Sequence, residues 1–124
     1  MAHILLIEDH DALRDMLCAA LTERGHEVVG ACDGQEGLKC YGEGSFDVVV
    51  TDMIMPRRDG VETIIALRRL NAGAHIIAIS GGGNLVPAEN CLEIATKIGA
   101  SQVLQKPFTV RALAACIASE LTAG

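Results

Sequence analysis

Five polar residues of this chain each follow a short apolar run. They comprise three carboxylates, one hydroxyl and one ammonium group: Glu8, Asp9, Asp52, Ser80 and Lys106. Three carboxylates that lie close together repel one another and raise each other's pKa unless a cation neutralises them. Mg²⁺ suits such a cluster, because it takes hard oxygen ligands, commonly one or two carboxylates with water and phosphate oxygens. If the fold brings these residues together, they form a candidate Mg²⁺ site.

Taken singly, each of these residues has an ordinary structural explanation. An acid at the end of a strand commonly caps a helix or lies in solvent, Ser80 suits a turn, and Lys106 suits an exposed surface. Lys106 precedes Pro107, which keeps the lysine out of the helical region and allows a cis bond that would fix the direction of the ammonium group. Only the joint placement of all five residues favours a site, and that placement depends on the elements around them.

The apolar runs predict five strands and the intervening periodicity predicts five helices. β-Branched and apolar residues indicate strands at residues 4–7, 28–31, 46–51, 75–79 and 103–105. Apolar residues at helical spacing, with capping residues and glycine stops, indicate helices at residues 11–25, 33–41, 59–69, 87–98 and from 110 onward. Strands that are continuous apolar runs are typical of a parallel sheet covered on both faces. We therefore predict a doubly wound α/β fold of the flavodoxin-like type, with five parallel strands and five helices.

In such a sheet, ligands bind outside the carboxyl ends of the strands. All five polar residues are predicted at those ends, so we expect them to converge on one edge of the sheet. His10, next to the acidic pair, is a further candidate ligand, but Mg²⁺ prefers oxygen, so a position at the start of the helix suits it better.

The composition of the chain argues against several classes of protein. The chain has 124 residues, 50% of them hydrophobic, and a formal charge of −6, which argues against non-specific binding to nucleic acid or anionic membranes. Residues 4–7 are too few for a signal peptide or a membrane span. The five cysteines form no C-x-x-C pair, which favours free thiols in a reducing compartment. We expect one cytoplasmic domain over residues 1–124.

Over essentially its full length the chain resembles the receiver domain of two-component response regulators. The resemblance depends on four motifs in a fixed order: Glu8-Asp9, Asp52-Met53-Ile54-Met55-Pro56 with Asp59-Gly60, Ser80-Gly81, and Lys106-Pro107-Phe108. Many members of the family continue into an output domain. Here we expect the stand-alone type, with no output domain, so the signal would leave by binding another protein.

The resemblance implies a phosphorylation mechanism and a role for each site residue. Asp52 would accept a phosphoryl group from a histidine kinase or a histidine phosphotransfer protein, and the domain would catalyse its own phosphorylation and dephosphorylation without being a conventional enzyme. Ser80 and Lys106 would each contact a phosphoryl oxygen. Mg²⁺ would be held by Glu8, Asp9, Asp52 and the backbone carbonyl of Ile54.

The sequence departs from the family pattern in its switch region. The position three residues before Lys106 usually carries Tyr or Phe as a rotameric switch, but here it is Val103. Valine is too small and too stiff about χ1 for that movement, so we expect the signal to leave through residues 81–87, where the chain is also longer than usual. An apolar Ile54, two residues after Asp52, offers an attacking water no hydrogen bond and suggests slow self-dephosphorylation.

Two other functions remain open from the sequence. A degenerate receiver would bind partners without being phosphorylated, although the intact Asp52, Ser80 and Lys106 argue against it. A small aspartyl-phosphate hydrolase or a flavodoxin-like nucleotide binder is the other, but the chain shows no separate general acid and no substrate cap. Met16 either packs in the core or forms, with Ala12, an exposed apolar spot on the first helix that docks the phosphodonor.

Overall fold

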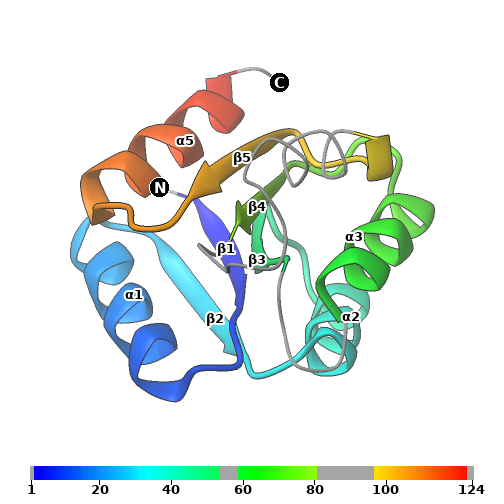
Figure 1. Cartoon of the computed structure of the whole chain (residues 1–124), viewed down its shortest axis with the longest axis horizontal. Coiled ribbons are helices and arrows are strands. Elements are labelled where there is room, and N and C mark those ends of the chain that lie inside the picture. The colour runs from blue at the N-terminus through cyan, green and yellow to red at the C-terminus, as the bar shows by residue number, and fades with distance from the viewer. Residues whose placement is uncertain (1, 54–58, 81–96, 123–124) are drawn as a thin grey trace.

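The computed structural model of the chain describes residues 2–53, 59–80 and 97–122, and arranges them in three layers (Figure 1). A parallel sheet forms the middle layer. The helices α1 (Asp11–Glu23) and α5 (Val110–Thr122) cover one face, and α2 (Gly34–Glu43) and α3 (Asp59–Leu70) cover the other. This arrangement confirms the doubly wound α/β prediction. Of the helix expected over residues 87–98, only 97 and 98 are described, and both are helical.

The sheet has five parallel strands in the order β2-β1-β3-β4-β5. The strands are β1 (His3–Ile7), β2 (Glu27–Ala31), β3 (Val48–Asp52), β4 (Ile76–Ser80) and β5 (Gln102–Gln105). The chain moves outward from β1 in one direction to β2 and in the other through β3 to β5. The strand order therefore reverses beside β1, which is where ligands bind in sheets of this kind.

The third strand begins two residues later than the sequence pattern predicts. Phe46 and Asp47 precede β3 instead of belonging to it. The Asp47 carboxylate accepts a hydrogen bond from the backbone N–H of His3 at 2.8 Å. The Phe46 ring packs 4.4 Å from the His3 ring, between centroids. These side-chain contacts occupy the segment that the apolar pattern had assigned to the strand.

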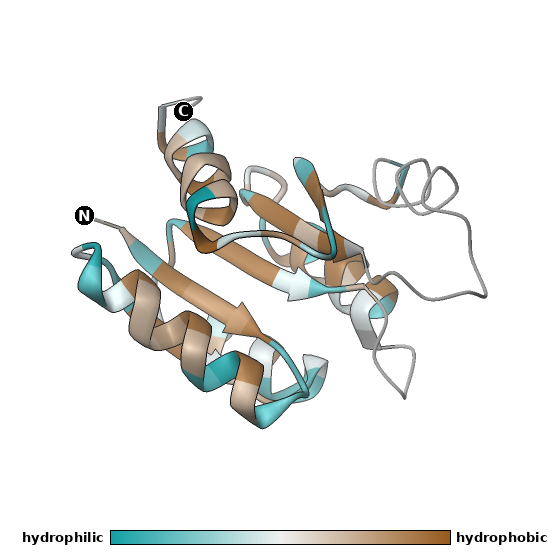
Figure 2. Ribbon diagram, turned by 60° about the vertical axis from the view of Figure 1, so that its left-hand side comes forward, coloured by the Kyte–Doolittle hydropathy of each residue, from teal (hydrophilic) through white to brown (hydrophobic). Residues whose placement is uncertain are grey.

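The strands supply the core from both of their faces. Along β1, Leu5 and Ile7 point into the cluster beneath α2 and α3, while Ile4 and Leu6 point into the cluster beneath α1 and α5. All four are fully buried. Strands buried on both sides are mostly apolar, and Figure 2 shows the central strands largely in the brown of hydrophobic residues, with white or teal at some strand ends.

Gly37 lies within α2 and permits a close approach to the sheet. A Cβ at this position would overlap the side chain of Ile7 on β1. The glycine that weakens the helical pattern in the sequence thus lets α2 pack directly on the strand that leads to the acidic pair. Gly25, at φ 95°, ends α1 as the sequence predicts.

The last turn of α5 differs from the apolar pattern. Leu121, which continues the spacing of Leu113 and Ile117, is 39% exposed, whereas Glu120 is 6% exposed. Glu120 is one helical turn past Ile117 on the buried side, and its carboxylate has hydrogen-bond partners on the sheet. No helix within the described ranges is long and apolar enough to cross a membrane.

Candidate functional site

The register of the parallel strands brings the predicted site residues to one edge of the sheet. Ile7 of β1 lies opposite Thr51 of β3, so the residues that follow these two emerge at the same level. Ser80 ends β4 opposite Gln105, the last residue of β5. The chain therefore delivers four of the expected side chains to neighbouring strand ends: Glu8, Asp9, Asp52 and Lys106.

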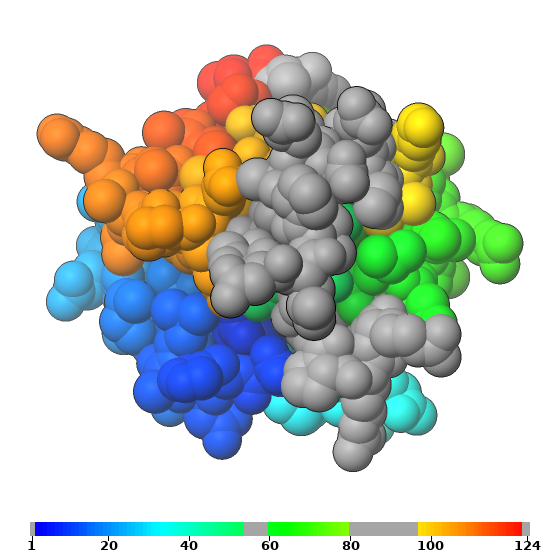
Figure 3. Space-filling view, viewed as in Figure 1, coloured from blue at the N-terminus to red at the C-terminus, as the bar shows by residue number. Residues whose placement is uncertain are grey.

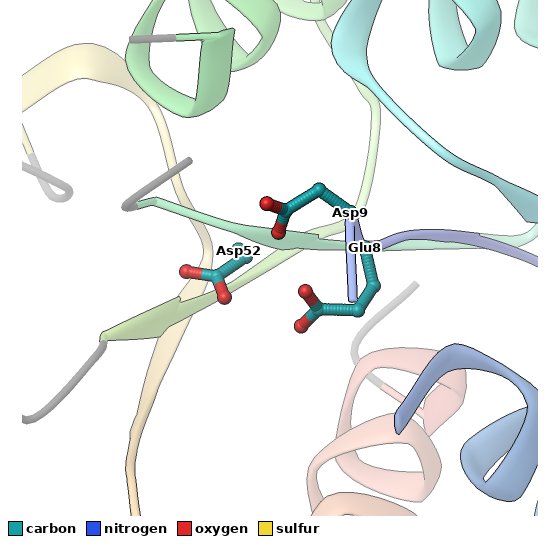
Figure 4. Close-up of side chains that lie close together, drawn as sticks. All are labelled: Glu8, Asp9 and Asp52. Atoms are coloured by element: carbon teal, nitrogen blue, oxygen red, sulfur yellow. The ribbon is translucent and has the colours of Figure 1, made fainter. Parts of the chain in front are cut away.

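Three carboxylates form a cluster at this edge (Figure 4). Glu8, Asp9 and Asp52 each offer an oxygen atom, and these atoms all lie within 4.8 Å of one another. Glu8 and Asp52 are almost completely buried, at 1% and 2% exposed, while Asp9 faces solvent. The cluster thus has a buried floor and one solvent-accessible side, as a site that exchanges ligands with solvent requires.

Lys106 reaches into this cluster from the end of β5. Its Nζ donates a hydrogen bond to Asp52 Oδ2 at 2.9 Å and lies 3.7 Å from Glu8 Oε1. Burial by itself lowers the pKa of the Lys106 ammonium. The hydrogen bond to Asp52 and the charges of Asp52, Glu8 and Asp9 outweigh burial and raise that pKa above its ordinary value. Lys106 therefore remains charged at neutral pH, and its bond to Pro107 is cis.

Glu8 is the most perturbed acid of the site. Burial raises the pKa of its carboxyl from 4.5 to about 7. The backbone N–H of His10, which donates to Oε2 at 3.1 Å, opposes the rise. The neighbouring Asp9 and Asp52 carboxylates add to it, and Lys106 opposes it. A cation bound nearby would stabilise the ionised form of this buried carboxyl group, which burial and the other acids disfavour.

The donor set fits a divalent cation that prefers oxygen. Glu8 Oε1 is buried and has no hydrogen-bond partner among the residues that the structure describes. Such a buried acceptor costs free energy unless something satisfies it. With oxygens of Asp9 and Asp52 within 4.8 Å, a hard cation such as Mg²⁺ would satisfy that atom and neutralise the cluster.

The start of α3 lies directly against the strand end that carries Asp52. A Cβ on Gly60 would overlap the backbone carbonyl oxygens of both Asp52 and Met53. Only glycine allows this approach, so Gly60 of the Asp59-Gly60 motif has a packing reason in this fold. The close approach places the start of α3 against the backbone of Asp52 and Met53.

Some expected site features lie outside the described residues. These are the backbone carbonyl of Ile54, the side chain of Ser80 and the whole segment 81–87. Val103 is described, and it is half-buried and packs against the core beneath α2 and α3. No aromatic side chain therefore occupies this position on β5.

Two residues that the sequence left ambiguous have defined places. His10 caps α1, because its Nδ1 accepts a hydrogen bond from the backbone N–H of Leu13 at 3.2 Å. This supports the helix-start interpretation of His10 over the metal-ligand one. Met16 is 49% exposed and is not a core residue. It lines a mainly apolar pocket of about 370 Å³ between α1 and residues 106–110, two segments that lie side by side in Figure 3 in blue and orange.

Sequence reasoning missed two polar residues that the fold uses. Arg14 donates a hydrogen bond to the backbone carbonyl of Glu8, beside the acidic cluster. Glu120 is buried at the opposite end of the sheet, paired with His75 and Gln102. The positions of Leu113, Ile117 and Glu120 are spaced as i, i+4 and i+7, and this spacing could have marked Glu120 as core-facing.

Comparisons with known proteins agree with this geometry. The family model for the response regulator receiver domain matches residues 4–118. The chemotaxis protein CheY of Halobacterium salinarum is 33% identical over 120 residues, which are 97% of this chain and 97% of CheY. The transcriptional regulatory protein AfsQ1 of Streptomyces coelicolor is 33% identical over 124 residues, but the chain spans only 53% of its length.

A solved structure shows the same architecture. The response regulator receiver domain protein from Clostridium thermocellum superposes with a TM-score of 0.89 at 30% identity, and the match covers 99% of this chain and 96% of that one. The strand order, the acidic cluster at the carboxyl edge and the family match over nearly the whole chain lead to one conclusion. This chain belongs to the response regulator receiver domain family of two-component signalling.

Proposed function

We propose that this receiver domain is a switch or relay module in which Asp52 accepts a phosphoryl group from a histidine kinase or a histidine phosphotransfer protein. One observation carries the proposal. The buried Asp52 carboxylate receives a hydrogen bond from Lys106 at 2.9 Å and lies within 4.8 Å of oxygens from two further acids. A carboxylate with a fixed cation on one side and an acidic, cation-seeking cluster on the other is suited to bind an anionic phosphoryl group.

Each side chain has a distinct task in the transfer. A carboxylate oxygen of Asp52 forms a bond to phosphorus while the bond between phosphorus and the donor histidine nitrogen breaks, and the electron pair of that bond stays on the nitrogen. Lys106 already holds one oxygen of the Asp52 carboxylate and would pair with a phosphoryl oxygen as negative charge builds up. Phosphoryl transfer depends mainly on such positioning and charge neutralisation.

The acidic residues would hold the metal that the transfer needs. Glu8, Asp9 and Asp52 would bind Mg²⁺, with the backbone carbonyl of Ile54 as a further ligand and Ser80 contacting another phosphoryl oxygen. The bound ion would supply positive charge to the phosphoryl oxygens. Glu8 would contribute its buried Oε1, which lies 3.7 Å from Lys106 Nζ and receives no hydrogen bond from any described residue.

Output would pass to another protein by binding. Phosphorylation replaces the single negative charge of Asp52 with a group of higher charge and three strong acceptor oxygens. Lys106 and the neighbouring residues would reorganise around that group and change the surface at the carboxyl edge of the sheet. The acidic balance of the chain, with a formal charge of −6, fits a protein partner better than nucleic acid.

Intact-mass measurement after incubation with a small phosphodonor tests the phosphoacceptor. The wild type should gain the mass of one phosphoryl group in the presence of Mg²⁺ and none when the metal is chelated. Asp52→Asn should gain none, because an amide is not a nucleophile towards phosphorus. Asp15→Asn, at an exposed acid on α1, is the matched control and should be modified like the wild type.

The same measurement separates the alternatives. A degenerate receiver would gain no mass under any of these conditions. Modification of Asp52→Asn to the wild-type extent would place the acceptor elsewhere, and Mg²⁺-independent modification of the wild type would contradict the metal site.

A further inference from the structure

Arg14 clamps the strand end that carries the acidic pair. From the second turn of α1, its Nη1 donates a hydrogen bond to the backbone carbonyl of Glu8 at 2.8 Å. Its Nη2 donates to the Asp11 carboxylate at 2.6 Å. The Arg14 side chain is only 18% exposed, and the Asp11 side chain is 81% exposed. The guanidinium is therefore anchored by the Glu8 backbone on its inner side and oriented by Asp11 on its outer side.

The aliphatic part of the Arg14 side chain packs on the sheet. It lies over Gly30 of β2, where an added Cβ would come within 3.2 Å of Arg14 Cδ and 3.3 Å of Arg14 Cγ. Contacts this short are tighter than usual, so the arginine stem would have to move by a few tenths of an ångström. The absence of a side chain at Gly30 thus leaves room for the Arg14 stem to pack closely on β2.

Arg14 completes a set of contacts that hold Glu8 at three of its four polar groups. The Glu8 backbone N–H donates to the Ala31 carbonyl at 3.0 Å, its own carbonyl accepts from Arg14, and its Oε2 accepts from the His10 N–H at 3.1 Å. The fourth group, Oε1, faces the cluster 3.7 Å from Lys106 Nζ without a hydrogen bond from any described residue. The constraints orient Glu8 and leave one oxygen available for a ligand.

We infer that Arg14 is a positioning residue for Mg²⁺ binding: by fixing the backbone between Glu8 and Asp9, it holds both carboxylates in ligand geometry. The inference rests on the proposed function, because it presupposes that the acidic cluster binds Mg²⁺. Partners that orient metal ligands from outside the coordination sphere typically alter metal affinity by about 10- to 100-fold when removed. Arg14 acts on the backbone of the ligand residue and touches neither the metal nor the phosphoryl group.

Calorimetric titration with Mg²⁺ alone tests this role. The informative variants are Arg14→Met, which keeps the stem on Gly30 but removes both donors, and Arg14→Lys, which keeps a positive donor. We expect Arg14→Met to raise the Mg²⁺ dissociation constant by about tenfold or more. Arg14→Lys should recover part of the lost Mg²⁺ affinity. Arg24→Met, at the exposed end of the same helix, should bind Mg²⁺ like the wild type.

The outcomes distinguish this inference from the proposed function. If the wild type does not bind Mg²⁺, the proposed metal site is wrong and the inference falls with it. If the wild type binds Mg²⁺ and folded Arg14→Met binds it equally well, Arg14 is a structural residue only and the inference is overturned, even if the variant melts earlier. Should Arg14→Met not fold, Arg14→Lys decides: a lower Mg²⁺ affinity than that of the wild type supports the positioning role, and wild-type affinity overturns the inference.

Discussion

Glu8 shows how burial and charge act together on a single residue. Its carboxyl is almost completely buried beside two other acids, and burial is the main reason that its pKa rises from 4.5 to about 7. In the unfolded chain the same group would titrate near its ordinary value. Between these two values the folded protein binds a proton that the unfolded chain has released.

This difference predicts a pH dependence for the metal-free protein. Because the folded pKa of Glu8 is raised, the folded state holds more protons than the unfolded state between pH 4.5 and about 7, so the Glu8 contribution to stability declines as pH rises through that range. Glu8→Gln should remove the decline. Urea unfolding with a chelator present, across this pH range, should show the variant gaining stability relative to the wild type towards pH 7.

Parallel pH curves for wild type and Glu8→Gln would show that Glu8 titrates alike in both states. Glu62→Gln, at an exposed position on α3, is the control and should follow the wild type.

At the scale of elements, Glu120 ties the last turn of α5 to the starts of two strands. Its carboxylate lies 3.0 Å from His75 Nδ1 and accepts a hydrogen bond from Gln102 Nε2 at 2.6 Å. Gln102 also donates to the backbone carbonyl of Cys116 at 3.1 Å. Burial alone would raise the pKa of Glu120, but hydrogen bonds from Gln102, His75 and Ser101 outweigh it and hold that pKa below its ordinary value.

We therefore expect Glu120→Ala to destabilise the domain by about 2 kcal/mol near neutral pH, because a charged hydrogen-bonding partner is removed and buried polar groups are left unpaired. The lowered pKa means that the stabilisation is present above pH 4.5 and is lost as pH falls through the folded value. Chemical denaturation near neutral pH and again below pH 4.5 measures this change in stability. Glu62→Ala should change stability by less than about 0.5 kcal/mol, and an equal effect in the two variants would show that the Glu120 contacts contribute nothing.

The exposed face of α1 carries an apolar residue beside a pocket near the site. Met16 is 49% exposed and borders the pocket formed with Pro107, Phe108 and Val110. The same pocket includes Lys106, whose Nζ contacts Asp52. A protein that delivers a phosphoryl group to Asp52 would come close to this apolar surface.

Met16→Glu should slow phosphoryl transfer from a cognate donor protein by about tenfold, because a charge would replace an apolar contact at the interface. Phosphorylation by a small donor should keep its wild-type rate, since Met16 is not among the residues proposed to bind the phosphoryl group or Mg²⁺. Rapid-quench measurement with both donors tests this. Thr22→Glu, an exposed position further along α1, is the control. Equal slowing with both donors would mean that Met16 affects the fold of the site instead.

At the scale of the whole molecule, an acidic protein concentrates three carboxylates at one edge of its sheet. The chain has a formal charge of −6, and within the described residues Lys106 makes ion-pair contacts with Glu8 and Asp52 of the cluster. Repulsion within the cluster opposes folding, so a cation that binds only the folded state stabilises the molecule by mass action.

Mg²⁺ should therefore raise the melting temperature of the wild type, with a gain equivalent to about 2.7 kcal/mol at 100 times the dissociation constant. Asp9→Ala should reduce that gain, because it removes one ligand while leaving the buried carboxylates in place. Scanning calorimetry with and without Mg²⁺ measures both effects. Asp15→Ala, at an exposed acid on α1, should retain the full gain, whereas an undiminished gain in Asp9→Ala would contradict its role as a ligand.

Much of this molecule could be predicted from local sequence alone. Apolar runs such as residues 46–51 and glycine stops such as Gly25 predicted where strands and helices lie, to within two residues at the start of β3, because these preferences act over a few residues. A parallel sheet aligns the carboxyl ends of its strands, so the convergence of Glu8, Asp9, Asp52 and Lys106 followed from their positions after apolar runs. The start of β3 departed from the prediction because Phe46 packs on His3, a residue distant in the sequence.

Other properties were decided only by the tertiary structure, because they depend on which distant groups meet and how much water each retains. Lys106 and Asp52 are 54 positions apart, and their hydrogen bond exists because β3, β4 and β5 are neighbours. The high pKa of Glu8 reflects burial, and the exposure of Met16 reflects its place on α1. The hydrogen bond from Arg14 to Glu8 depends on α1 packing beside the end of β1. Local sequence preferences carry no information about such contacts, since each arises from the packing of separate elements against one another.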